Sequence, residues 1–173
     1  MRSVKKPLET KSLEEVVKAF DLSDKSLNAF LRKLIKWNLF EIRPKSMDHM
    51  LMKHAEVEPF AAWSTVTESQ RRSSFPYDSG RSLVAMMTDF WCLQSPNENF
   101  ELFQKENQNF PASLNHSVVF HTADKLDPLA WYLFETTCNV HSSDRFLMRG
   151  TVFEKSGRCV ATYEQEGYKA NDT

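Results

Sequence analysis

The sequence lacks the patterns of a secreted, disulfide-stabilised or metal-binding protein. Its three cysteines, Cys92, Cys138 and Cys159, are odd in number and no two have C-x-x-C spacing. This argues against a disulfide framework and against a zinc site, and we expect free, buried thiols in a reducing compartment. The basic N-terminus has no apolar segment of the secretory type. No apolar run is long enough to span a bilayer, so we expect no membrane span.

No charge of either sign dominates. The chain has 22 Lys and Arg against 23 Asp and Glu, which argues against a protein drawn as a whole onto nucleic acid or an anionic membrane. Internal repeats and low-complexity segments are also absent. With 173 residues, 41% of them hydrophobic and 13 of them Phe, the chain has room for one packed domain and a modest extension.

Residues 1–36 are predicted to be a helical extension or linker. Ser12 and Glu15 have the spacing of a capping box at the start of one helix. A second helix is expected to begin near Ser23 or Asp24, and both helices continue with one apolar face. We assign the remaining residues, 37–173, to a single domain.

The second predicted helix also resembles a winged-helix recognition unit. Its basic side chains suit phosphate contacts and are Lys25, Arg32, Lys33 and Lys36. Residues 1–36 contain nine Lys or Arg and five Asp or Glu, a net charge of +4. Pro44 interrupts the following strand where a wing would form, so we prefer a solvated linker to a DNA-binding module.

Residues 37–173 predict an α+β fold. Leu83, Met86, Met87 and Phe90 fall at helical spacing, and a polar loop is expected over 70–74. The expected elements are strands over 39–44 and 59–67, a helix over 79–94, and strands over 113–121, 131–140, 146–153 and 158–165. A turn at 154–157 joins the last two strands. This order is typical of a long helix packed on a curled antiparallel sheet.

Three sequence blocks resemble one enzyme family. Residues 85–90 are a helical block with an aspartate, residues 112–121 contain Asn115-His116-Ser117, and residues 159–167 end in Gln165-Glu166-Gly167 after an Arg149-Gly150 pair. Their order and spacing resemble the second half of the type II, double-hotdog acyl-CoA thioesterases. The resemblance covers roughly the last two-thirds of the chain and implies a hotdog fold.

The resemblance implies that Asp89, Ser113 and Gln165 are catalytic residues that position a water molecule. Asp89 would be the general base, and Ser113 and Gln165 would orient the water that hydrolyses fatty acyl-CoA to fatty acid and CoA. The leaving thiol has a pKa of roughly 8.5, so its departure needs little acid assistance. No metal or cofactor is implied, because CoA is part of the substrate.

Two alternatives keep the fold and change the role. Ser113 would be a nucleophile if His116 or His121 served as its base, and His121 has the strand parity of Ser113. The chain would instead be a non-catalytic acyl-CoA-binding or scaffold subunit if it lacked turnover. Asn115 and Val119 depart from the family, which commonly has an aspartate and a large aromatic residue there.

The resemblance extends to only one of the family's two hotdog units. A single unit exposes a sheet edge and apolar surface that the second unit would cover. We therefore expect a homodimer or pairing with another hotdog chain. Members of the family work in peroxisomes or in the cytosol, which implies an intracellular location, although residues 171–173 do not form a Ser-Lys-Leu signal.

Overall fold

A computed structural model describes residues 6–19, 35–45, 59–71, 79–92, 112–142 and 145–168. Its elements are η1 (Pro7–Glu9), α1 (Leu13–Ala19), β1 (Phe40–Pro44), β2 (Phe60–Val66), α4 (Glu68–Arg71), α5 (Ser79–Cys92), β3 (Ala112–Phe120), β4 (Tyr132–Ser142), β5 (Arg145–Glu154) and β6 (Cys159–Tyr168). The predicted strands and the long helix are all present, each within a few residues of its expected bounds.

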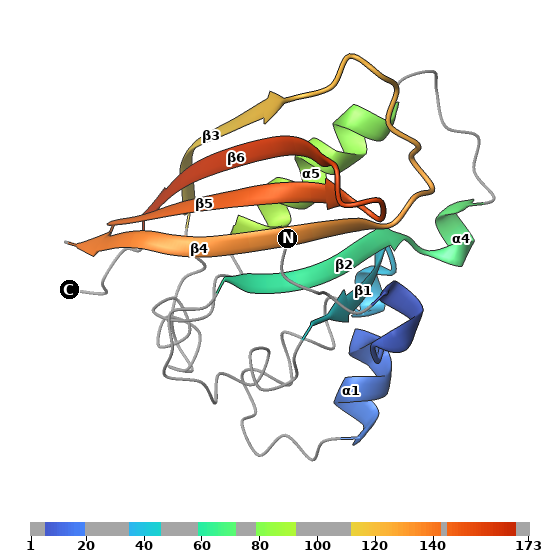
Figure 1. Cartoon of the computed structure of the whole chain (residues 1–173). Helices are drawn as coiled ribbons and strands as arrows, with labels where there is room; N and C mark the ends of the chain where they lie inside the picture. Colours follow the sequence, from blue (N-terminus) through green and yellow to red (C-terminus); the bar gives the residue numbers. More distant parts are fainter. Residues whose placement is uncertain are drawn as a thin grey trace.

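The six strands form one antiparallel sheet in the order β1-β2-β4-β5-β6-β3. The sheet curls around α5, which lies behind β5 and β6 in Figure 1. The predicted α+β arrangement of a long helix on a curled antiparallel sheet is therefore confirmed. Because β3 directly follows α5 in the chain but pairs with the last strand, the topology brings residues from the middle and the end of the sequence together.

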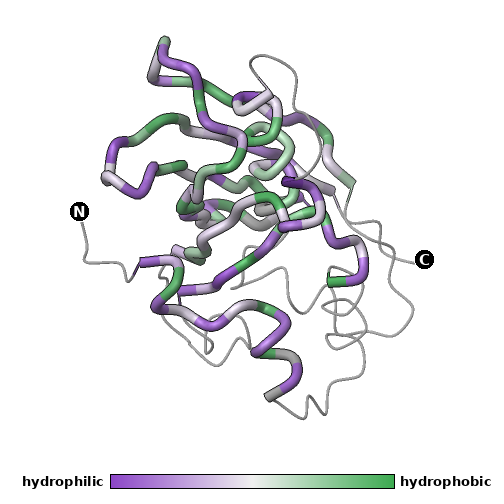
Figure 2. The backbone as a smooth tube through the Cα atoms, turned by 90° about the vertical axis from the view of Figure 1, so that its right-hand side faces the viewer, coloured by the Kyte–Doolittle hydropathy of each residue, from purple (hydrophilic) through white to green (hydrophobic). Residues whose placement is uncertain are grey.

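The main core lies between α5 and the sheet. Val84 and Met87 of α5 pack with side chains from the facing strands, which include Phe134, Met148 and Ala161. All five are at most 1% exposed. Along the described chain in Figure 2, hydrophobic and hydrophilic stretches alternate over short distances.

A smaller apolar cluster lies on the other face of the sheet. Ala61, Trp63 and Leu133 are buried there, with Trp131 and Phe153 packed against them. The Arg43 guanidinium lies over the Trp131 ring, 5.7 Å from its centroid, and donates a hydrogen bond to the backbone oxygen of Thr10. Because Arg43 belongs to β1, this contact ties the N-terminal segment to the sheet.

The predicted capping box begins α1. Ser12 donates its backbone N–H to the Glu15 carboxylate over 2.7 Å, and the Glu15 backbone N–H donates to Ser12 Oγ over 3.2 Å. Leu13 of α1 belongs to the main core, so the helix packs on the domain. The division of the chain at residue 36 stays a prediction. The second predicted helix, with Lys25, Arg32 and Lys33, falls mostly outside the described residues, as does the DNA-binding alternative that rests on it.

Two local predictions need correction. Residues 70 and 71 are not loop but belong to α4, where the backbone N–H groups of Gln70 and Arg71 both donate to Thr67 O over 3.0 Å. Cys138 and Cys159 form no disulfide, as predicted, but both are half-buried and not buried. Partial burial raises the pKa of the Cys159 thiol, because it disfavours the thiolate. The Cys92 side chain lies outside the description.

Candidate active site

The three side chains singled out from the sequence meet at one point between α5, β3 and β6. The amide nitrogen of Gln165 lies 2.5 Å from Asp89 Oδ1 and 2.5 Å from Ser113 Oγ. Ser113 Oγ lies 3.5 Å from the same Asp89 oxygen. Asp89 and Gln165 are 76 positions apart in the chain, so only the fold brings these groups together.

Strand register places Ser113 beside Gln165. Ser113 is opposite Gly167 in the β3–β6 pairing, and Gly167 is two residues after Gln165 on the same face of β6. The Phe146 ring occupies the space beside Gly167, where a side chain would otherwise stand. Gln165 is fully buried, whereas Asp89 and Ser113 are exposed. The cluster is therefore buried on the side of Gln165 and open to solvent on the side of Asp89 and Ser113.

A bulge in β3 sets which side chains face α5. The β3–β6 register shifts between Ser113 and Asn115, so that Leu114 is an extra residue and His116 is opposite Gln165. Side chains before and after a bulge lose their simple alternation. Ser113 and His116 therefore both face α5, and Ser117 faces the other side of the sheet.

Hydrogen-bond chemistry orders the cluster. An ionised carboxylate only accepts hydrogen bonds, so the Gln165 NH₂ group, and not its oxygen, points at Asp89. The Ser113 hydroxyl accepts from Gln165 and is free to donate to Asp89. The remaining oxygen of Gln165, Oε1, is buried and has no hydrogen-bond partner among the residues that the structure describes. A buried acceptor without a donor is costly, so this position suits a donor such as water.

Each of the two histidines makes its side-chain hydrogen bond to a threonine and not to Ser113. His121 Nε2 lies 2.9 Å from Thr162 Oγ1, and His116 Nε2 lies 3.0 Å from Thr88 Oγ1. The expected parity between His121 and Ser113 is wrong, because the bulge at Leu114 reverses the alternation along β3. The side chain that Ser113 faces is the Asp89 carboxylate, and not an imidazole.

Sequence reasoning missed Thr88. Its side chain is fully buried, and its hydroxyl bonds both the backbone oxygen of Ala85 and the His116 imidazole. A polar residue on the apolar face of the predicted helix, next to Asp89, was the available signal.

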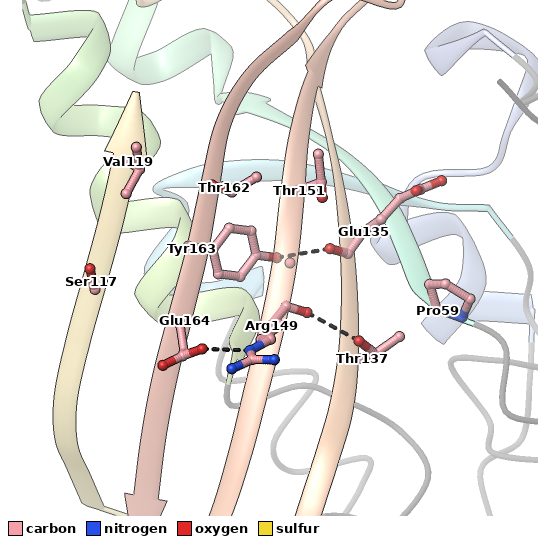
Figure 3. Close-up of a pocket in the computed structure, with 11 residues that line it drawn as sticks. Pro59, Ser117, Val119, Glu135, Thr137, Arg149, Thr151, Thr162, Tyr163 and Glu164 are labelled. Carbon is pink, nitrogen blue, oxygen red and sulfur yellow. Dashed lines mark hydrogen bonds and ion pairs between the residues drawn. The ribbon is translucent and has the colours of Figure 1, made fainter. Parts of the chain in front are cut away.

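A groove of about 560 Å³ lies on the opposite face of the sheet (Figure 3). Its lining includes the Arg149–Glu164 ion pair at 2.5 Å. Thr137 donates to the backbone oxygen of Arg149 over 3.4 Å. Glu164 precedes Gln165 in β6 and so points away from α5. The Asp89–Ser113–Gln165 cluster is therefore not part of this groove.

Within the described ranges, no helix combines the length and the apolar composition that crossing a bilayer requires. A comparison with curated proteins finds no match. The fold is similar to solved structures of thioesterases, all at low sequence identity.

The acyl-CoA thioesterase II TesB2 from Mycobacterium marinum is 18% identical with a TM-score of 0.67, and the match covers 100% of this chain and 56% of that one. A conserved protein with a hot dog fold from Alicyclobacillus acidocaldarius is 14% identical with a TM-score of 0.58, covering 100% and 55%. A hypothetical thioesterase from Streptococcus pneumoniae, solved with coenzyme A, is 15% identical with a TM-score of 0.50, covering 76% and 90%.

These likenesses confirm the hotdog fold. The chain spans little more than half the length of the first two structures. The family model for acyl-CoA thioesterases matches residues 58–168, which is more than half of the chain and contains all three predicted site residues. The chain therefore belongs to the acyl-CoA thioesterase family.

Proposed function

We propose that this protein hydrolyses fatty acyl-CoA thioesters and that Asp89, Ser113 and Gln165 carry the reaction. The observation that supports this proposal is the convergence of the three side chains within hydrogen-bonding distance, with Gln165 Oε1 left as a buried acceptor. The family match makes a thioester the substrate class to test. The coenzyme A that accompanies the Streptococcus pneumoniae structure supports a CoA thioester.

In the proposed reaction, water is held between the Asp89 carboxylate and Gln165 Oε1. Asp89 takes one proton from the water as the water oxygen bonds to the thioester carbon. The carbon–sulfur bond then breaks as the carbonyl re-forms, and the leaving CoA thiolate takes up the proton that Asp89 accepted, which restores the carboxylate. The products are a fatty acid and CoA, so no oxidant, metal or further reactant is needed.

Substitutions at Asp89 and Ser113 test these roles. Release of the CoA thiol from short, medium and long acyl-CoA is measured for the wild-type chain, Asp89→Asn and Ser113→Ala. We expect Asp89→Asn to lower kcat by about 10²–10⁴-fold, the usual contribution of a general base. Ser113→Ala should also lower kcat, because the hydroxyl bonds both other members of the cluster.

Ser117→Ala is the matched control. Ser117 is on the same strand but lines the groove on the opposite face, so this variant should keep wild-type turnover. Thermal stability should change little in Asp89→Asn, because Asp89 is exposed. Wild-type activity in Asp89→Asn would contradict the proposed base. A wild-type chain that binds acyl-CoA without turnover would instead support the non-catalytic binding or scaffold subunit.

We further propose that the protein forms a homodimer through β3. This strand ends the sheet order, so its outer backbone edge has no strand partner among the described residues. Leu114 and Val119 are 48% and 54% exposed on it, and exposed apolar edges favour pairing with another strand. A cytosolic or peroxisomal location stays a prediction.

The molar mass in solution tests the dimer. Light scattering at micromolar concentration should give twice the monomer mass, and Val119→Lys should shift the protein towards monomer. A monomer mass for the wild-type chain would contradict self-association, and recovery of dimer mass only with another thioesterase-like chain would replace the homodimer with a heteromeric pair.

A further inference from the structure

Thr88 and His116 form a polar contact between α5 and β3, beside the proposed catalytic cluster. Thr88 is fully buried, and its Oγ1 lies 2.7 Å from the backbone oxygen of Ala85. A carbonyl oxygen only accepts, so the single hydroxyl hydrogen of Thr88 points at Ala85. Towards His116 Nε2, 3.0 Å away, the hydroxyl is therefore an acceptor. The hydrogen of that second bond must come from the imidazole.

The direction of this hydrogen bond determines which nitrogen of the His116 ring carries a proton. Nε2 of His116 carries a proton, and in the neutral imidazole Nδ1 is the unprotonated nitrogen. The ring orientation is set by a buried partner on a long helix, although His116 itself is exposed. A surface histidine would ordinarily sample several rotamers, so the bond restricts the edge strand that carries it.

The contact adjoins two members of the cluster. Thr88 precedes Asp89 on α5, and His116 is opposite Gln165 in the β3–β6 pairing. Both Ser113 and His116 face α5 only because of the bulge at Leu114. The bulge therefore allows both the Ser113–Asp89 contact and the His116–Thr88 contact.

Ser113 needs such a support. Its strand is at the edge of the sheet, and its own bond to Asp89 is 3.5 Å long, at the limit of a hydrogen bond. The shorter Thr88–His116 bond links the same helix to the same strand three residues further on. Small displacements of a catalytic group lower the rate strongly, since the reacting atoms must be aligned.

We propose that Thr88 and His116 are positioning residues that hold Ser113 against Asp89 and Gln165. The proposal rests on the proposed thioesterase function. A brace with only a structural role would lower stability and leave the turnover of folded molecules unchanged. A positioning pair lowers kcat while KM changes little, because its bond acts on the alignment of Ser113 and not on substrate binding.

Four variants test the pair. Thr88→Val removes the acceptor, and Thr88→Ser keeps it. His116→Leu removes the donor, and His116→Gln places an amide N–H at similar reach. We expect Thr88→Val and His116→Leu each to lower kcat about 10-fold with KM within about 2-fold. Thr88→Ser should remain near wild type and His116→Gln should recover part of the loss. The double variant Thr88→Val/His116→Leu should be no slower than either single variant, because one bond is lost in all three.

Nitrogen-15 NMR of the imidazole gives a reading independent of activity. The wild-type His116 ring should be the Nε2–H tautomer with the chemical shift of a hydrogen-bonded Nε2–H, and Thr88→Val should lose that hydrogen-bond shift. An Nδ1–H tautomer in the wild type, or wild-type kcat in folded Thr88→Val and His116→Leu, would overturn the inference and leave the proposed function standing. A wild-type chain without thioesterase turnover would overturn the proposed function and the positioning role with it.

Discussion

Gly167 is predicted to be required because of the Phe146 ring. A Cβ atom at Gly167 would lie 2.0 Å from Cε2 and 2.1 Å from Cζ of Phe146, far inside the shortest contacts that real Cβ atoms make. Phe146 is 1% exposed and belongs to the main core, so the ring has no open space to enter. Forcing one extra carbon into a packed core typically costs about 1–3 kcal/mol.

Gly167→Ala should therefore lower the free energy of unfolding by about 1–3 kcal/mol, measured by urea denaturation. Turnover should fall as well, because Gly167 is opposite Ser113 and two residues from Gln165. The two shortest contacts involve the outer atoms of the Phe146 ring, whereas Cδ2 would be 3.0 Å away. Phe146→Leu removes these two atoms and should cost less than the about 3–5 kcal/mol of a Phe-to-Ala change.

A double-mutant cycle isolates the contact. In the Phe146→Leu background, Gly167→Ala should cost almost nothing, so the coupling energy should approach the full effect of the single substitution. Gly157→Ala is the control: Gly157 has φ 92° in the β5–β6 turn, so alanine is strained there whatever residue 146 is. Additivity of Gly167→Ala and Phe146→Leu within about 0.5 kcal/mol would refute the steric explanation.

Two further predictions concern the surface. Ser12→Ala should lower the free energy of unfolding by about 1 kcal/mol, the usual value of an N-cap, and circular dichroism in urea would measure it; an unchanged midpoint would contradict the role of the capping box. The Arg158 guanidinium, 2.6 Å from Asp124, holds the pKa of that carboxyl below its ordinary value. Because the folded-state pKa is depressed, the stabilisation is present above the ordinary pKa and is lost as the pH falls through the folded value. Asp124→Asn should thus destabilise the protein at pH 7 and much less at pH 2; an equal effect at both would argue against the ion pair.

Local structure follows from the sequence because its causes lie within a few residues. The capping box of Ser12 and Glu15, the apolar spacing in α5 and the Gly157 turn each depend on neighbours along the chain. These features, and the strands, could be predicted because each depends on residues that are close together in the sequence. The choice of Asp89, Ser113 and Gln165 depended on the family resemblance, since a lone aspartate on a helix flank has no distinctive local signal.

The tertiary structure decided which distant residues meet. No local pattern indicates that β3 pairs with β6, which places Ser113 and Gln165 in contact across 52 positions. The bulge at Leu114 is also invisible in the sequence, because it is a mismatch between two strands and not a property of either one. Because of the bulge, His121 lies on the opposite face of the sheet from Ser113, and His116 lies against Thr88. Sequence determined the elements through short-range contacts; strand register, which depends on long-range packing, determined the site.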